Sequence, residues 1–356
     1  MTNYLLAGGG TAGHVNPLLA LADRIKLHEP TAVVIALGTA EGLEARLVPL
    51  RGYELVTVER LPFPRRLNRY AVDFPKRYAR AVAEVRKLIR DRNIEVVVGF
   101  GGYASAPAYE AARAEGVPFA IHEANALPGL ANRRGARHAS AVAVTFEGTK
   151  LKNAQLVGMP LRAEIEALLS GGDKAEARKH FGLDESTTTL LVTGGSLGAK
   201  RINETLEASR HVLAAAGIQV LHVMGNRSEL AEVHDSNYVR LAYCDRMDLA
   251  IAAADAAVSR SGAATVSEFT ALGLPAVFVP YPVGNGEQAL NAKTAVAAGS
   301  AILVEDAKFD LDFVTNSIVP LVSDSRRLAA MREAAATIAI TDGAERLYRV
   351  LASLRS

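Results

Sequence analysis

Residues 4–18, YLLAGGGTAGHVNPL, place a histidine directly after a glycine-rich turn. Gly8, Gly10 and Gly13 have the G-x-G-x-x-G spacing with which dinucleotide-binding proteins hold a pyrophosphate. The imidazole of His14 can accept or release a proton near neutral pH. The stretch therefore predicts one of two chemistries, hydride transfer with a dinucleotide or anion binding beside a general base.

Two features of the following residues argue against a dinucleotide. The pair Asn16-Pro17 is typical of a helix N-cap and first helical residue, which predicts a helix that begins at Pro17, after the glycines. Such a helix would not present its N-terminus to a pyrophosphate on the loop. The second apolar run, Val33–Leu37, ends in Gly38-Thr39, where the fingerprint needs an acidic residue for the ribose, and Glu41 comes late. An NAD-dependent oxidoreductase is therefore the minority hypothesis.

Glycine turns follow three more apolar runs. These turns are Gly99–Gly102, Gly194–Gly198 and Ser261–Gly262. For any one of them, a simple tight connection between a strand and a helix remains an open interpretation. Four such loops at strand ends, the first included, favour a site where many backbone N–H groups meet anionic oxygens.

Other polar residues near strand ends are open to two interpretations. His122 follows an apolar run and is either catalytic or a hydrogen-bonded structural histidine. Glu268, near the start of a helix, could accept hydrogen bonds from two ribose hydroxyls or simply be a favourable charge there. Asp310, in the only D-x-D, is expected to be a helix N-cap. No metal site and no cofactor are predicted.

The apolar runs have strand length, are continuous rather than alternating, and are separated by helical patterns. This pattern predicts parallel sheets covered by helices on both faces, an α/β architecture with doubly wound sheets. The second half repeats the plan of the first, so we expect two Rossmann-like domains whose sheets face a central cleft. Their predicted boundaries are 1–162 and 163–340, with a linker near Gly158–Arg162 and a final helix, about 341–356, that packs back on the first domain.

Composition limits the remaining classes. Cys244 is the single cysteine, which excludes an internal disulfide and a cysteine-rich metal site and favours a reducing compartment. No secretion signal is recognised, and the longest uncharged stretch, Phe269–Gly286, is interrupted by three prolines. We therefore expect no membrane-spanning helix.

Positive charge is concentrated between Arg60 and Arg92, where the sequence contains eleven Lys/Arg and only three acidic residues. The stretch interleaves aromatic and basic side chains, and Asp73 can cap a helix there. Three interpretations compete: a solvated helix with a core face, a nucleic-acid site, and a peripheral site on an anionic membrane. No nucleic-acid motif supports the second, and we expect no nucleic-acid partner. The predicted membrane patch comprises Phe74, Arg77, Tyr78 and Arg80, and Arg133, Arg134 and Arg137 extend it.

Seven segments, distributed from residue 8 to residue 292, together resemble the MurG family, the membrane-associated N-acetylglucosaminyltransferases of bacterial peptidoglycan synthesis. The resemblance implies a GT-B fold and inverting transfer of GlcNAc from UDP-GlcNAc to the C4 hydroxyl of the muramyl sugar of lipid I, which gives lipid II. It also implies a peripheral location on the cytoplasmic face of the plasma membrane, with other cell-wall and division proteins as candidate partners. The segments are GGGTAGHVNP, FGGYASAP, HEANALPGLANR, GMPLR, VTGGSLGA, RSGAATVSE and EQALNA.

The resemblance also implies roles for individual residues. His14 matches the favoured general base, Tyr103 an acceptor- or donor-side polar residue, and Glu268 the residue that binds the ribose. The implied substrate-binding residues are Thr11, Ala12 and Gly13 in the first loop, Asn125 as an acceptor- or donor-side polar residue, Arg162 and Ser196 near the diphosphate, Cys244 through its backbone to uracil, Ala263, Ala264, Thr265, Val266 and Ser267 in the nucleotide loop, and Gln288 and Asn291 on the donor sugar.

Two rival functions remain beside the transferase. A UDP-GlcNAc 2-epimerase would use the same fold and donor without a lipid acceptor. A non-catalytic nucleotide-sugar-binding regulator would bind the donor and not turn it over.

Overall fold

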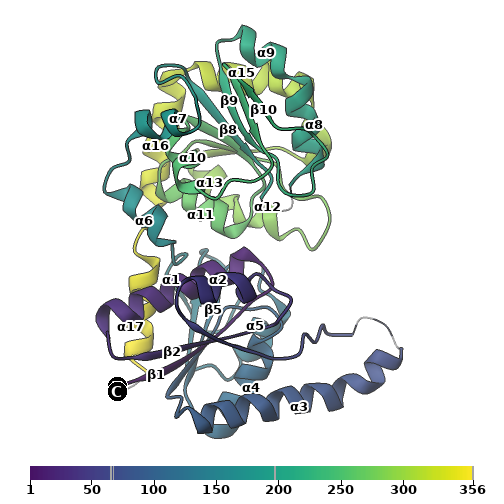
Figure 1. Cartoon of the computed structure of the whole chain (residues 1–356), viewed down its shortest axis with the longest axis vertical. Helices are drawn as coiled ribbons and strands as arrows, with labels where there is room; N and C mark the ends of the chain where they lie inside the picture. The colour runs from purple at the N-terminus through teal and green to yellow at the C-terminus, as the bar shows by residue number, and fades with distance from the viewer. Residues whose placement is uncertain (65, 67, 196–197, 355–356) are drawn as a thin grey trace. The chain divides into compact units, whose positions relative to one another are not determined.

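The chain folds into two compact units. The computed structural model describes residues 1–356 except 65, 67, 196–197 and 355–356. Unit 1 comprises Met1–Arg162 and Asp342–Ser356, and unit 2 comprises Ala163–Thr341. Each contains a seven-stranded sheet with helices packed against it (Figure 1). This architecture confirms the predicted doubly wound α/β class.

The sheet of unit 1 is parallel throughout, in the order β3-β2-β1-β4-β5-β6-β7. The strand order reverses between β1 and β4, and a ligand crevice forms at such a switch point, outside the carboxyl ends of the strands. The strands are β1 Asn3–Ala7, β2 Val33–Gly38, β3 Glu54–Thr57, β4 Val96–Gly99, β5 Phe119–Glu123, β6 Ala141–Val144 and β7 Ala154–Leu156. The helices are α1 Ala12–His28, α2 Glu44–Leu50, α3 Arg69–Asp91, α4 Ser105–Glu115, α5 Leu130–Gly135 and α17 Gly343–Ala352.

Successive residues of β1 point to opposite faces of this sheet and enter two separate cores. Tyr4 and Leu6 pack into the core that includes residues of α1 and α17. Leu5 and Ala7 pack into the core formed with residues of α3 and α4. The central strand is thus buried on both sides, which explains its continuous apolar sequence.

The returning helix α17 is part of the first of these cores and lies beside α1 in Figure 1. Leu347 and Leu351 have no exposed surface. The rings of His28 and Tyr348 stack with centroids 4.4 Å apart, and the Tyr348 hydroxyl donates to Glu29 at 3.0 Å. Gly343 must be glycine, because a Cβ there would overlap the backbone carbonyl of Met159.

Unit 2 repeats this plan in the order β10-β11-β9-β8-β12-β13-β14, with β10 antiparallel to β11. Its switch point lies between β8 and β12. The strands are β8 Thr189–Thr193, β9 Gln219–Val223, β10 Val233–Asp235, β11 Tyr238–Leu241, β12 Ala256–Ser259, β13 Ala276–Phe278 and β14 Ala301–Leu303. The helices are α6 Ala163–Leu169, α7 Lys174–His180, α8 Lys200–Ala208, α9 Arg210–Ala215, α10 Met247–Ala253, α11 Ala263–Ala271, α12 Glu287–Asn291, α13 Lys293–Ala298, α14 Leu311–Phe313, α15 Val319–Ser323 and α16 Ser325–Ile338, with a 3-10 helix at Asp306–Lys308 and a π-helical turn at Val314–Ile318.

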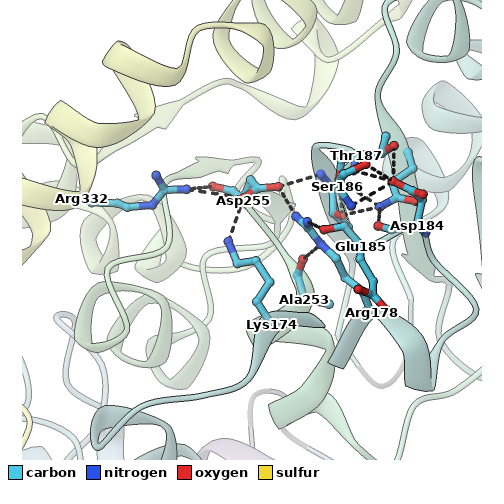
Figure 2. Close-up of polar contacts among 11 residues, drawn as sticks. Lys174, Arg178, Asp184, Glu185, Ser186, Thr187, Ala253, Asp255 and Arg332 are labelled. Atoms are coloured by element: carbon cyan, nitrogen blue, oxygen red, sulfur yellow. Dashed lines mark hydrogen bonds and ion pairs between the residues drawn. The ribbon is translucent and has the colours of Figure 1, made fainter. Parts of the chain in front are cut away.

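A single carboxylate joins four elements at the amino ends of β8 and β12 (Figure 2). Asp255, directly before β12, accepts from Lys174 Nζ at 2.8 Å, from Arg178 Nη2 at 2.5 Å and from the Thr189 N–H at 2.8 Å. Arg332 of α16 donates to its backbone carbonyl at 3.1 Å. Burial alone would raise the pKa of Asp255, but the bond from Lys174 and these neighbours hold it below its ordinary value. The glycine loops lie at the other end of these strands, the carboxyl end, where parallel sheets bind ligands.

Two predicted helix starts are wrong. Helix α1 begins at Ala12, with Thr11 as its extended N-cap, and not at Pro17. Helix α3 begins at Arg69, where Asn68 caps it by accepting from the Ala71 N–H at 3.0 Å, and not after Asp73. In both cases a proline lies inside the helix beyond its first turn, where it removes one backbone hydrogen bond to the carbonyl four residues earlier, so the proline does not mark the helix start. The predicted cap Asp310 is confirmed, since its side chain accepts from the Phe313 N–H at 2.9 Å.

Across the described ranges, every helix is too short or too polar to traverse a lipid bilayer.

Replacing Leu347 by alanine tests how much unit 1 depends on α17. Because this side chain is fully buried, we expect the free energy of unfolding of unit 1 to fall by about 2–5 kcal/mol. Hydrogen exchange of the β1 amides in increasing urea measures the change. Leu311→Ala, at a residue of unit 2 that is 38% exposed, is the matched control and should alter stability by less than about 1 kcal/mol. A loss no greater than that control would show that α17 contributes little to the core.

Candidate active site

The glycine loops after β1 and β4 touch at the switch point of unit 1. Gly102 has φ +80°, and a Cβ there would lie 2.6 Å from the carbonyl oxygen of Gly9. The buried Ser105 hydroxyl accepts from the Gly101 N–H at 3.0 Å and lies 2.8 Å from the Ala7 carbonyl, to which it can donate. The two loops are therefore held as one surface at the carboxyl end of the sheet.

His14 lies in the first turn of α1, half-buried beside these loops. Its Nδ1 is 2.9 Å from the Gly9 carbonyl oxygen and 3.5 Å from the Thr11 hydroxyl. A carbonyl only accepts, so Nδ1 carries the hydrogen and Nε2 keeps its lone pair. Gly101 makes room for the ring, because a Cβ there would lie 3.1 Å from Nε2. This arrangement suits a general base that acts through Nε2.

The helix start found for α1 removes one of the two arguments against a dinucleotide site, and the other remains. No acidic residue ends β2. Glu44, at the start of α2, accepts from the Thr39 N–H at 2.8 Å and from the Gly10 N–H at 2.7 Å and has no exposed surface. Its carboxylate therefore binds protein donors in place of a ribose. Nothing in the local sequence pattern marks this residue as functional.

A second buried carboxylate shapes the loop after β5. Glu123 accepts from the N–H groups of Asn125 at 2.9 Å and Gly129 at 3.0 Å. It also accepts from Asn132 Nδ2 at 2.9 Å, and Asn132 in turn accepts from the Tyr109 hydroxyl at 2.7 Å. The position of Asn125 thus depends on Glu123, and the place of this acid at the end of an apolar strand is the sequence signal that could identify it.

His122 is a structural histidine by its environment. It has no exposed surface, and its Nε2 is 3.0 Å from the Gly158 carbonyl oxygen. Burial lowers its pKa from 6.5 to about 4, so the ring stays neutral near pH 7. The geometry favours the structural interpretation over the catalytic one.

Two other predicted residues of unit 1 are half-buried. The guanidinium of Arg60 lies over the Tyr103 ring, 5.0 Å from its centroid, which restrains that ring by a cation–π contact. Arg162 ends the first segment of unit 1.

In unit 2, α11 begins directly after β12 and its loop. The N-cap is Gly262, and no side chain caps the helix, so its first N–H groups are suited to an anion. Glu268 lies in the second turn with a buried side chain. The predicted stretch before it forms the first turns, with Ala263 and Val266 buried and Ala264, Thr265 and Ser267 half-buried.

The short helix α12 is tied to the same edge of the sheet. Asn291 is buried and donates from Nδ2 to the Ser261 carbonyl at 3.2 Å. Gln288 accepts from the Tyr281 N–H at 2.9 Å. Ser196, predicted in the loop after β8, lies outside the described residues.

The remaining features of unit 2 are a thiol and a pocket. Burial raises the pKa of the Cys244 thiol to about 11, so this side chain is no nucleophile near pH 7. A pocket of about 360 Å³ lies beside the start of α8 and is lined in part by Gly198, Asn203 and Arg227. Among the side chains that the structure describes, no group of three or more His, Cys, Asp or Glu could hold a metal ion.

The comparison with protein families identifies both units. Residues 4–144 match the glycosyltransferase family 28 N-terminal domain, and residues 189–347 match the glycosyltransferase family 28 C-terminal domain. A protein of Leifsonia xyli subsp. xyli is 58% identical over 351 residues, which cover 99% of this chain and 98% of that relative. It is named UDP-N-acetylglucosamine--N-acetylmuramyl-(pentapeptide) pyrophosphoryl-undecaprenol N-acetylglucosamine transferase.

Solved structures agree on the fold. MurG of Acinetobacter baumannii superimposes with a TM-score of 0.78 at 24% identity, covering 99% of this chain and all of that one. UDP-GlcNAc 2-epimerase of Neisseria meningitidis gives a TM-score of 0.70 at 14% identity and covers 99% and 100% of the two chains. The predicted GT-B fold is confirmed.

The pKa of His122 leads to a pH dependence of stability. In the unfolded chain this histidine takes up a proton below about pH 6.5, whereas in the folded chain it does so only near pH 4. Its contribution is therefore complete above pH 6.5 and is lost as the pH falls to 4, by about 3 kcal/mol in total. Urea denaturation of the wild type and His122→Asn at pH 7, 6 and 5 isolates this contribution in the difference between the two proteins. A difference that does not change with pH would contradict the assignment.

Proposed function

This chain belongs to the family of UDP-N-acetylglucosamine–N-acetylmuramyl-(pentapeptide) pyrophosphoryl-undecaprenol N-acetylglucosamine transferases, within glycosyltransferase family 28, and we propose from this membership that it makes lipid II. It transfers GlcNAc from UDP-GlcNAc to the C4 hydroxyl of the muramyl sugar of lipid I. The observation that carries the proposal is the 58% identity to a relative of that name over nearly the whole of both chains.

His14 is the general base of this proposal. The Gly9 carbonyl holds the hydrogen of the ring on Nδ1, so Nε2 can take the proton of the acceptor hydroxyl. The hydroxyl oxygen then forms the new bond to the anomeric carbon of GlcNAc as the bond to UDP breaks on the opposite face. One in-line displacement of this kind inverts the anomeric centre, and the proton ends on His14.

The donor is held by unit 2. The uncapped N-terminus of α11 and the glycine loops receive the charge that develops on the diphosphate. Glu268 accepts from the ribose hydroxyls, and the backbone at Cys244 contacts uracil. Gln288 and Asn291, both anchored to neighbouring backbone, bind the donor sugar. Thr11, Ala12, Gly13, Tyr103, Asn125, Arg162 and Ser196 complete the proposed substrate-binding set.

An aromatic cluster on unit 1 supports peripheral binding to the cytoplasmic face of an anionic membrane. Phe74 lies within 6 Å, centroid to centroid, of Phe63, Tyr70 and Tyr78. Cell-wall and division proteins are further proposed partners at this location.

The basic residues in the first half of α3 divide into paired and unpaired groups. Arg77 is paired with Glu59, and Arg80 with Glu84 at 3.0 Å, so these arginines attract anionic lipid less than their number suggests. Arg69 and Lys76 are exposed and have no partner among the residues described here, and Val72 between them is 79% exposed. We assign the membrane contact to this side of α3, beside the aromatic cluster.

A transfer assay tests the proposed function and the role of His14 together. Radiolabel from UDP-GlcNAc should move to lipid I with the wild-type protein, and His14→Ala should lower that rate about 10²–10⁴-fold, because the base is lost. The affinity for UDP, measured by calorimetry, should change less than about twofold. Label that stays in free sugar would favour a 2-epimerase, and absence of turnover with intact UDP binding would favour a regulator. Wild-type turnover of His14→Ala would remove His14 from its role.

Charge reversal at the two unpaired residues tests the membrane contact. Arg69→Glu combined with Lys76→Glu should weaken binding to vesicles of anionic phospholipid by at least about 30-fold at low salt, since losing each basic residue near such a surface costs ~1 kcal/mol and the two new negative charges add to that loss. Sedimentation with vesicles measures the effect. Arg46→Glu, on α2 and thus on the opposite face of the sheet, is the control and should leave binding unchanged. Equal binding of all three proteins would exclude this surface.

A further inference from the structure

Glu44 is a fully buried carboxylate with three protein donors. Its Oε1 accepts from the Thr39 N–H at 2.8 Å and the Thr39 hydroxyl at 2.9 Å. Its Oε2 accepts from the Gly10 N–H at 2.7 Å. Burying a charged group is unfavourable unless it is hydrogen-bonded in this way, so a specific arrangement holds Glu44 in place.

Three glycines provide the space for this carboxylate. A Cβ at Gly9, Gly38 or Gly42 would overlap the Glu44 side chain. These glycines come from three places: the loop after β1, the end of β2, and the connection to α2. None of the three belongs to the glycines that match the G-x-G-x-x-G spacing.

The Gly10 N–H and the Gly9 carbonyl belong to the same peptide group. The N–H donates to Glu44, and the carbonyl oxygen accepts from His14 Nδ1 at 2.9 Å. The peptide is planar and rigid, so its two ends cannot move independently. A carboxylate on the N–H also polarises the group and strengthens the carbonyl as an acceptor.

We propose that Glu44 is the positioning residue for His14 and acts through the Gly9–Gly10 peptide. The contacts lead from the Glu44 carboxylate through the Gly9–Gly10 peptide to the His14 imidazole, so Glu44 orients the base from behind. It fixes the ring with hydrogen on Nδ1 and stabilises the imidazolium that forms when Nε2 takes a proton. This proposal rests on the proposed function, in which His14 is the base.

The variant Glu44→Gln keeps the size of the side chain and removes its charge. The Gln amide has one accepting oxygen, which the two Thr39 donors retain, so its NH2 group faces the Gly10 N–H and displaces the Gly9–Gly10 peptide from His14 Nδ1. We therefore expect the His14 ring to shift toward the tautomer with hydrogen on Nε2, as observed by ¹⁵N NMR of histidine-labelled protein, with the His14 signals assigned by their loss in His14→Ala. We also expect kcat to fall about 10- to 100-fold, the usual effect of losing a hydrogen-bond partner behind a functional imidazole. The affinity for UDP should remain within about twofold.

Thr39→Val is the matched control. It removes one hydrogen bond of the same carboxylate on the β2 side and leaves the bond to Gly10. A purely structural role of Glu44 predicts that both variants lower the melting temperature and that both retain the wild-type tautomer and kcat. The proposal predicts that only Glu44→Gln changes the tautomer and kcat.

A double-mutant cycle with His14→Ala completes the test. If Glu44 acts through His14, adding Glu44→Gln to His14→Ala should lower kcat by less than about twofold. Additive losses, or an unchanged tautomer in Glu44→Gln, would overturn the proposal. Wild-type kcat in His14→Ala would instead reject the base role, while the NMR result would still report the contact chain. Should Glu44→Gln fail to fold, Gly42→Ala displaces the carboxylate without removing it and should give the same shift in tautomer.

Discussion

The carboxyl end of the sheet in unit 1 depends on the burial of one negative charge. A carboxylate without solvent access must find donors, and those nearest to Glu44 are a loop N–H and the first residue beyond β2. The side chain can reach them only if the surrounding backbone carries no Cβ. The glycines around it therefore make room for the Glu44 carboxylate, and the contacts of that carboxylate define the shape of the loop after β1.

Glu123 organises the loop after β5 in the same way. It gathers two backbone N–H groups and one side-chain amide, and so determines the path of the chain from β5 to α5. The loops after β1 and β5 are thus organised by acids from within the unit, and this end of the sheet also carries the Thr11 hydroxyl and the His14 imidazole. Such a surface is suited to anionic and hydroxylated substrates, because the carboxylates that would repel them are already engaged.

Features with a local cause could be predicted from the sequence. Continuous apolar runs identified the parallel sheets, and the glycine turns marked the strand ends that lie at both switch points. Helix starts were predicted less well, because Asn16-Pro17 and Asp73 resemble start signals while Thr11 and Asn68 are the N-cap residues. Glu44 and Gly10 are far apart in the sequence, and nothing local signals their bond. The same holds for Arg77 and Glu59, whose pairing changes the charge of the basic stretch only after folding.

The contribution of α17 to the core of unit 1 has a consequence for the order of synthesis. Leu347 and Leu351 complete a core whose other buried residues precede the whole of unit 2 in the chain. On a ribosome that adds ~5–20 residues per second, the first segment waits on the order of 10–40 s for its last helix. During that interval the apolar side of α1 has no cover from α17, while unit 2 emerges without interruption. A chaperone that binds the nascent chain would therefore find its apolar target on the part made first.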